Sequence, residues 1–112
     1  MKAGYQLVMS AHALADFAHQ LPIFFNSWKE NSNNLISLST QNEQSLIEIY
    51  NKLKISGAPI IAFYEPDHHN QMTAICFYGT PQYRKMVSSL PLALKNCYKP
   101  EIKEYYTEDI EK

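Results

Sequence analysis

Two apolar runs of strand length, separated by a short polar connection, constrain this sequence more than any other feature. The first run, residues 60–64, is continuous and is typical of a strand buried on both faces. The polar residues 65–71 join it to a second run, residues 72–78, and Gly79 and Pro81 end that run. We therefore predict two consecutive strands inside the fold.

Helical periodicity and capping residues mark the segments before these strands. A helix is expected over residues 4–19, with Pro22 opening a short second helix over residues 23–29. Residues 35–39 alternate apolar and polar, which predicts a strand. Thr40 and Glu43 form a capping-box pattern for a further helix that Gly57 ends. The apolar stripe expected to bury the first helix is Leu7, Val8, Ala11, Leu14, Ala15 and Ala18.

A last helix over residues 82–89 completes the order of elements and indicates an α/β fold. We expect a small mixed β-sheet of three to four strands with helices packed on it. Only three strands are visible in the sequence, and such a sheet leaves two edges open. A further strand is therefore expected from the C-terminal tail or from another chain, which predicts a homo-oligomer. Residues 1–95 form the single α/β domain, and residues 96–112 form a charged, tyrosine-bearing tail.

Charge and apolar content exclude several classes of protein. The formal net charge is −1, so any contact with RNA must come from a local patch. No apolar run approaches the roughly 20 residues that cross a bilayer, and the N-terminus carries no signal-peptide pattern. We therefore expect a cytoplasmic protein without a membrane partner. Cys76 and Cys97 lack metal or redox spacing and are expected to be free thiols.

Several short motifs resemble the type-2 peptidyl-tRNA hydrolases. Residues 10–14, Ser-Ala-His-Ala-Leu, are similar to the Ser-His-Ala segment on that family's first helix. Residues 65–67, Glu-Pro-Asp, fall where the family has an Asp-Ala-Gly turn, and Thr73 falls where a threonine opens its last strand. The resemblance covers residues 3–94. It implies the family's α/β fold and, for an active member, cleavage of the ester between a peptide and tRNA.

The departures from the family's pattern fall on its functional residues. Family members begin with a strand and a turn of the form Lys-Met-Gly-Lys-Gly-Lys, of which only Lys2 and Gly4 remain here. The Arg-Thr-Gln segment that follows the Asp-Ala-Gly turn is also missing. The chain is therefore expected to be either truncated upstream or a divergent relative with another function.

Three residues are candidates for catalysis. Glu65 and Asp67 lie on one turn, and paired carboxylates can divide the acid and base roles. The alternative is that Asp67 only caps the turn through its own backbone. Thr73 follows as a hydroxyl donor. His68 and His69 are adjacent, so they point apart in an extended chain and do not suggest a metal site.

Candidates for ligand binding lie on the first and last helices. Lys2, Gly4, Tyr5 and Gln6 stand at a helix start, where free N–H groups attract an anion such as phosphate. His12 either lines the same site or is a half-buried histidine bonded to a carbonyl. Arg84 follows Tyr83, which suggests either a stacking-plus-phosphate surface or an ordinary solvated face.

Two functions are compatible with these residues. The first is a non-catalytic, phage-encoded protein that sequesters a nucleotide, a cyclic nucleotide signal or an RNA end, and so counters host defence. The alternative is an active peptidyl-tRNA hydrolase, although almost no lysines lie near the candidate catalytic residues. Neither function calls for a cofactor. In both, the start of the first helix is expected to lie beside the connection between residues 65 and 73.

Overall fold

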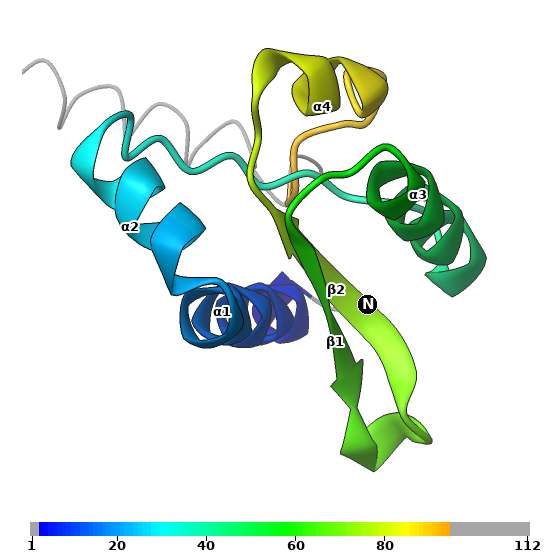
Figure 1. Cartoon of the computed structure of the whole chain (residues 1–112). Helices are drawn as coiled ribbons and strands as arrows, with labels where there is room; N and C mark the ends of the chain where they lie inside the picture. The colour runs from blue at the N-terminus through cyan, green and yellow to red at the C-terminus, as the bar shows by residue number, and fades with distance from the viewer. Residues whose placement is uncertain (1–2, 95–112) are drawn as a thin grey trace, which may run out of the picture.

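Two consecutive helices open the fold. The computed structural model describes residues 3–94, and Figure 1 shows the arrangement of its elements. Helix α1 spans Ala3–Gln20, and α2 spans Pro22–Glu30 with its proline in the first turn. Proline is favoured there because its missing N–H would have no helical partner. Both predicted helices are confirmed.

The buried face of α1 differs from the predicted stripe. Met9, Ala13 and Phe17, spaced four residues apart, are buried, whereas Leu7 and Val8 are 58% and 50% exposed. The helix carries apolar residues on both faces. The face with Ala13 and Phe17 is the one that packs against Ile61 of the sheet and so buries its apolar area.

The predicted strand over residues 35–39 is wrong. This segment forms one isolated bridge, between Leu38 and Leu92. The N–H of Ser39 donates to the carbonyl of Pro91 at 3.0 Å, but Pro91 has no N–H with which to extend the ladder. The sheet within residues 3–94 therefore has two strands, where three to four were expected.

Helix α3 spans Glu43–Ile55, and its cap also differs from the prediction. The side chain of Asn42 accepts a hydrogen bond from the N–H of Ser45 at 2.9 Å. Asn42 is thus the N-cap in place of Thr40. This shift frees the carboxylate of Glu43, which accepts a hydrogen bond from the backbone N–H of Met72 at 2.8 Å and so joins α3 to the sheet.

The two central strands are confirmed, as an antiparallel hairpin. Strand β1 spans Ile60–Glu65 and β2 spans Gln71–Phe77, joined by a short 3-10 helix, η1 (Pro66–His68). The register pairs Phe63 with Ala74 and Tyr64 with Met72, so Thr73 is the extra residue of a β-bulge. Helix α4 spans Pro81–Met86 and ends earlier than predicted.

Helices pack on both faces of the hairpin (Figure 1). On one face Ala13 and Phe17 of α1 are packed with Ile61. On the other, Leu53 of α3 is fully buried with Ala58 and Val87. Cys76 packs against the first cluster, and burial raises the pKa of its thiol from 9.0 to about 11. None of the helices in the described part of the chain is long and apolar enough to cross a membrane.

Candidate functional site

A groove of about 1120 Å³ runs along the side of β2. Residues 71–75 of β2 form one wall, and the segment 37–43 together with residues 91–94 forms the opposite wall. Tyr5, Gln6, Leu7 and Ser10 reach the groove from α1, and Leu46 reaches it from α3. The groove therefore lies in the layer of the sheet, between the two helices that cover its faces.

The start of α1 lies beside the connection between the two strands. The ring of Tyr5 meets the ring of His68 edge-on, with centroids 5.2 Å apart and planes at 70°. His68 is the last residue of η1, and both side chains line the groove near Thr73. The predicted proximity of the first helix and residues 65–73 is confirmed by this contact.

Two hydroxyl groups at this end of the groove are buried without a hydrogen-bond partner among residues 3–94. They are the phenol oxygen of Tyr5 and Oγ1 of Thr73. Thr73 reaches this position through the β-bulge, which leaves it without a partner residue on β1. A buried hydroxyl without a partner is costly and uncommon, so each of these two calls for an explanation.

Glu65 and Asp67 lie at η1 and are not among the residues that line the groove. The carboxylate of the buried Glu65 accepts the N–H of Asp67 at 3.2 Å and caps the 3-10 helix. This is the capping role that the sequence suggested for Asp67. Asp67 itself is exposed on η1, and neither residue lines the groove.

The two carboxylates still influence the site through their charge. Burial, and then the nearby charges of Glu65 and Asp67, raise the pKa of the Tyr5 phenol. Tyr5 therefore stays protonated at neutral pH and is available as a hydrogen-bond donor. A negatively charged group is disfavoured beside it, whereas a neutral base or a sugar hydroxyl is not.

The other predicted binding residues are dispersed. Gly4 lies in the first turn of α1, and Gln6 lines the groove. His12 is exposed and stacks on Phe63 with ring centroids 4.7 Å apart, so it lies apart from the groove. Arg84 is on α4, also apart from the groove, and Lys2 lies outside the described residues.

Sequence reasoning missed two groove residues that matter to the site. His68 was considered only as a metal ligand, whereas it is the aromatic partner of Tyr5. Glu43 was considered only for helix capping, whereas it lines the groove and accepts the N–H of Met72. A glutamate in a first helical turn is such a common feature that no local pattern separates the two roles.

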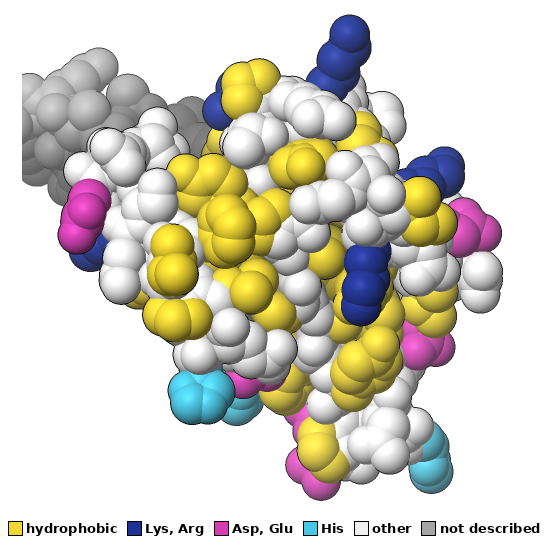
Figure 2. Space-filling model, viewed as in Figure 1, with side chains coloured by type: hydrophobic (Ala, Val, Ile, Leu, Met, Phe, Trp, Pro, Cys, Tyr) yellow, Lys and Arg dark blue, Asp and Glu magenta, His cyan; other side chains and the backbone are white. Residues whose placement is uncertain are grey.

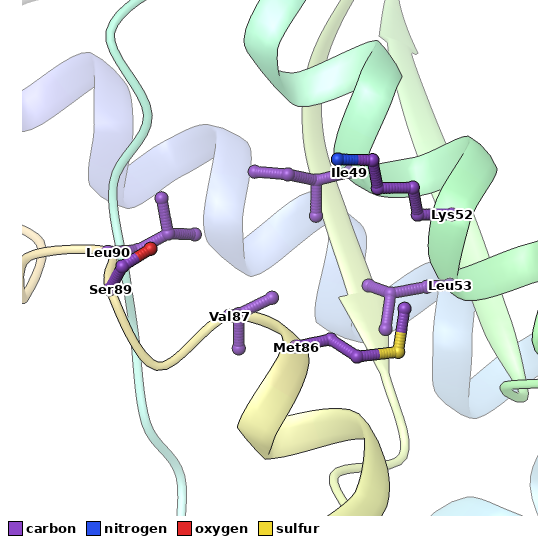
Figure 3. A pocket seen from close by; sticks show the side chains of 7 residues that line it. All are labelled: Ile49, Lys52, Leu53, Met86, Val87, Ser89 and Leu90. Carbon is purple, nitrogen blue, oxygen red and sulfur yellow. The ribbon is translucent and has the colours of Figure 1, made fainter.

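No group of three or more histidine, cysteine or acidic side chains within residues 3–94 is placed to hold a metal ion. A second hollow, of about 160 Å³, lies between α3 and the turn that follows α4 (Figure 3). Its lining is apolar, except for Lys52 and Ser89, and includes the buried Leu53 and Val87. We interpret it as a gap in the packing because few polar groups converge on it.

No family model matches this chain, and no curated protein matches its sequence.

Proposed function

We propose that this protein is a non-catalytic binding protein that holds a nucleotide-type ligand at the Tyr5–Thr73 end of the groove. We propose that it sequesters a cyclic nucleotide signal or an RNA end, as a phage counter-defence protein would. We also propose that its scaffold is related to the type-2 peptidyl-tRNA hydrolases. That proposal rests on residues 10–14, which lie on α1, and on the order of the elements.

The observation that carries the proposal is the pair of buried hydroxyls without partners. Tyr5 and Thr73 each present a hydroxyl in the same groove, and a bound ligand with acceptor oxygens or ring nitrogens would satisfy both. The aromatic rings of Tyr5 and His68 stand beside them. Aromatic side chains stack on bases of any sequence, which suits a nucleotide-type ligand.

The charges around the site favour one orientation of such a ligand. Burial, and then the negative charges of Glu65 and Asp67, raise the pKa of Tyr5. The uncharged base and sugar are therefore expected near Tyr5 and Thr73. The phosphate is expected further away, at the first turn of α1. There the N–H groups have no helical partner and the backbone at Gly4 is open, with no heavy atom within 4 Å of the position of a Cβ atom.

Peptidyl-tRNA hydrolysis is the competing function, and the site supports it less well. That reaction needs a base for the attacking water and cations for the tRNA backbone. The carboxylate of Glu65 already caps η1, and Asp67 lies apart from the groove. On the face shown in Figure 2, lysine and arginine side chains are scattered and do not form a stripe.

Titration calorimetry against mono-, di- and cyclic nucleotides tests the proposal. Thr73→Val and Tyr5→Phe each remove one hydroxyl, so each should weaken binding of the best nucleotide about three- to tenfold. Thr80→Val, which is at the start of α4 and away from the groove, is the matched control and should leave the affinity unchanged. Lys2→Glu should weaken binding and also change its salt dependence.

Absence of binding by any nucleotide, or binding that survives both groove substitutions, would show that the assignment is wrong. Incubation with a synthetic peptidyl-tRNA separates the two functions. We expect no release of peptide above the uncatalysed rate. Release at rates typical of an enzyme, abolished by Asp67→Ala, would establish the hydrolase in its place.

A further inference from the structure

The groove has an unpaired backbone edge along its β2 wall. The N–H of Tyr78 donates to the carbonyl of Pro59 at 2.9 Å, and hydrogen-bonded and non-hydrogen-bonded pairs alternate along an antiparallel ladder. The pairs Ile61–Cys76 and Phe63–Ala74 are therefore hydrogen-bonded. The N–H and C=O groups of Ile75 consequently point away from β1, toward the groove.

The opposite wall presents a second unpaired edge. The carbonyl of Ser37 accepts the N–H of Ala93 at 2.9 Å, and the N–H of Ser39 donates to Pro91, so these groups face residues 91–93. The N–H and C=O of Leu38 then point away from residues 91–93, and Leu38 itself lines the groove. Within residues 3–94, no hydrogen bond from another element reaches the main-chain groups of Leu38 or Ile75.

The groove is covered on two opposite sides by helices, as a strand inside a sheet would be. Leu7 and Ser10 of α1 contribute from one side, and Leu46 of α3 contributes from the other. An extended chain between Leu38 and Ile75 would thus be paired on both edges and covered on both faces. With a rise of about 3.3 Å per residue, residues 71–75 accommodate a strand of about five residues.

The lining determines which strand fits. Glu43 is the single carboxylate among the described residues of the groove, which include no lysine or arginine, and it is committed to the N–H of Met72. A charged side chain would be buried there without a partner, so the strand must be uncharged and mainly apolar. Strands covered on both faces are typically continuous apolar runs.

The tail of this chain and a second copy of its hairpin do not meet these requirements. Residues 101–111 carry Glu101, Lys103, Glu104, Glu108, Asp109 and Glu111, so they would bring charges into the slot. A second copy offers two uncharged apolar runs, but both already form the hairpin. Neither the tail nor the hairpin of a second copy therefore fits the slot.

We propose that the groove between Leu38 and Ile75 binds an extended, uncharged, mainly apolar strand of about five residues from a partner polypeptide and thereby completes the sheet. The main-chain groups of Ile75 and Leu38 bind its two edges. Leu7 and Leu46 cover its side chains. The inference is argued from the backbone edges and not from the buried hydroxyls, so it does not depend on the nucleotide.

A capped synthetic peptide, acetyl-Lys-Gly-Thr-Val-Ile-Val-Thr-Gly-Lys-amide, tests the proposal on the full chain. Nuclear magnetic resonance of the isotope-labelled protein should show saturable binding. In the complex, exchange of the Ile75 and Leu38 amide hydrogens should slow at least tenfold. The Ala74 amide, which is already bonded within the hairpin, should change less than twofold.

Two controls separate strand pairing from general apolar association. The same peptide with N-methyl groups on its isoleucine and second valine keeps its side chains but loses backbone donors, and it should bind at least tenfold more weakly. In the protein, Leu7→Arg should weaken binding by a similar factor. Val8→Arg, on the same helix and similarly exposed but not lining the groove, should stay within twofold of the unmodified protein.

The proposal is overturned by any one of three results. They are no binding at millimolar peptide, equal binding of the N-methylated peptide, and equal effects of Leu7→Arg and Val8→Arg. Circular dichroism of both variants confirms that α1 is intact. If Leu7→Arg alone loses helix, Ser10→Arg replaces it in the test, and the same weakening of peptide binding is expected.

Discussion

Thr73 is the residue at which the proposed ligand site can be tested on the free protein. Its hydroxyl is buried without a partner at the β-bulge. Thr73→Val removes the hydroxyl and keeps the branched shape, so the free energy of unfolding without ligand should rise by about 1 kcal/mol. Urea denaturation measures this change.

The matched variant for this prediction is Thr40→Val. The hydroxyl of Thr40 donates to the carbonyl of Asn42 at 3.4 Å, so its removal should leave the stability unchanged or lower it by up to about 1 kcal/mol. A loss of stability in Thr73→Val would mean that the hydroxyl is already satisfied in solution. The argument for a ligand at this site would then lose its main support.

The residues of the site were predictable only where local sequence fixes their position. Tyr5 and Thr73 reach the groove because each lies at the end of an element that the sequence marks clearly. His12 was misplaced because apolar residues occur on both faces of α1, so periodicity alone does not say which face packs. The pairing of Tyr5 with His68 depends on tertiary structure, and no local pattern reports it.

Glu43 joins two elements, so its substitution should weaken the attachment of α3 to β2. Its carboxylate accepts the N–H of Met72, a residue that is 5% exposed, so Glu43→Ala leaves a buried donor unpaired. We expect a loss of about 1–3 kcal/mol in the free energy of unfolding. Glu43→Gln should lose less because its amide oxygen can still accept the bond.

Glu48→Ala is the control on the same helix. Glu48 is exposed and its partner is Gln44, one turn away, so the change should stay within about 0.5 kcal/mol. Equal effects of Glu43→Ala and Glu48→Ala in thermal and urea unfolding would contradict the role of Glu43 as a tie between α3 and β2.

The elements themselves were largely predictable, and their sheet was not. All four helices and the two central strands follow from periodicity, capping residues and apolar runs. The segment 35–39 has the alternation of a strand but finds only Leu92 as its bridge partner. A strand exists only where a neighbour supplies hydrogen bonds, and alternation in one segment carries no information about that neighbour.

At the scale of the whole molecule, an incomplete sheet determines how the protein behaves in solution. A two-stranded sheet is marginal on its own, and large apolar side chains reach the surface across the face in Figure 2. The edge of β2 lies in the groove, whereas Tyr64 on β1 is 50% exposed. We predict that β1 mediates self-association, because an exposed strand edge is a template for pairing.

Light scattering at micromolar concentration should therefore give a mass above the 12.9 kDa of one chain. Tyr64→Lys places a charge beside the β1 edge and should shift the protein to a monomer, as lysines on natural edge strands prevent pairing. Ile55→Lys changes a residue that is more exposed, at 86%, but lies at the end of α3, away from the strands. It should leave the mass unchanged. A monomer before any substitution would argue against the oligomer, and equal effects of the two substitutions would argue against β1 as its interface.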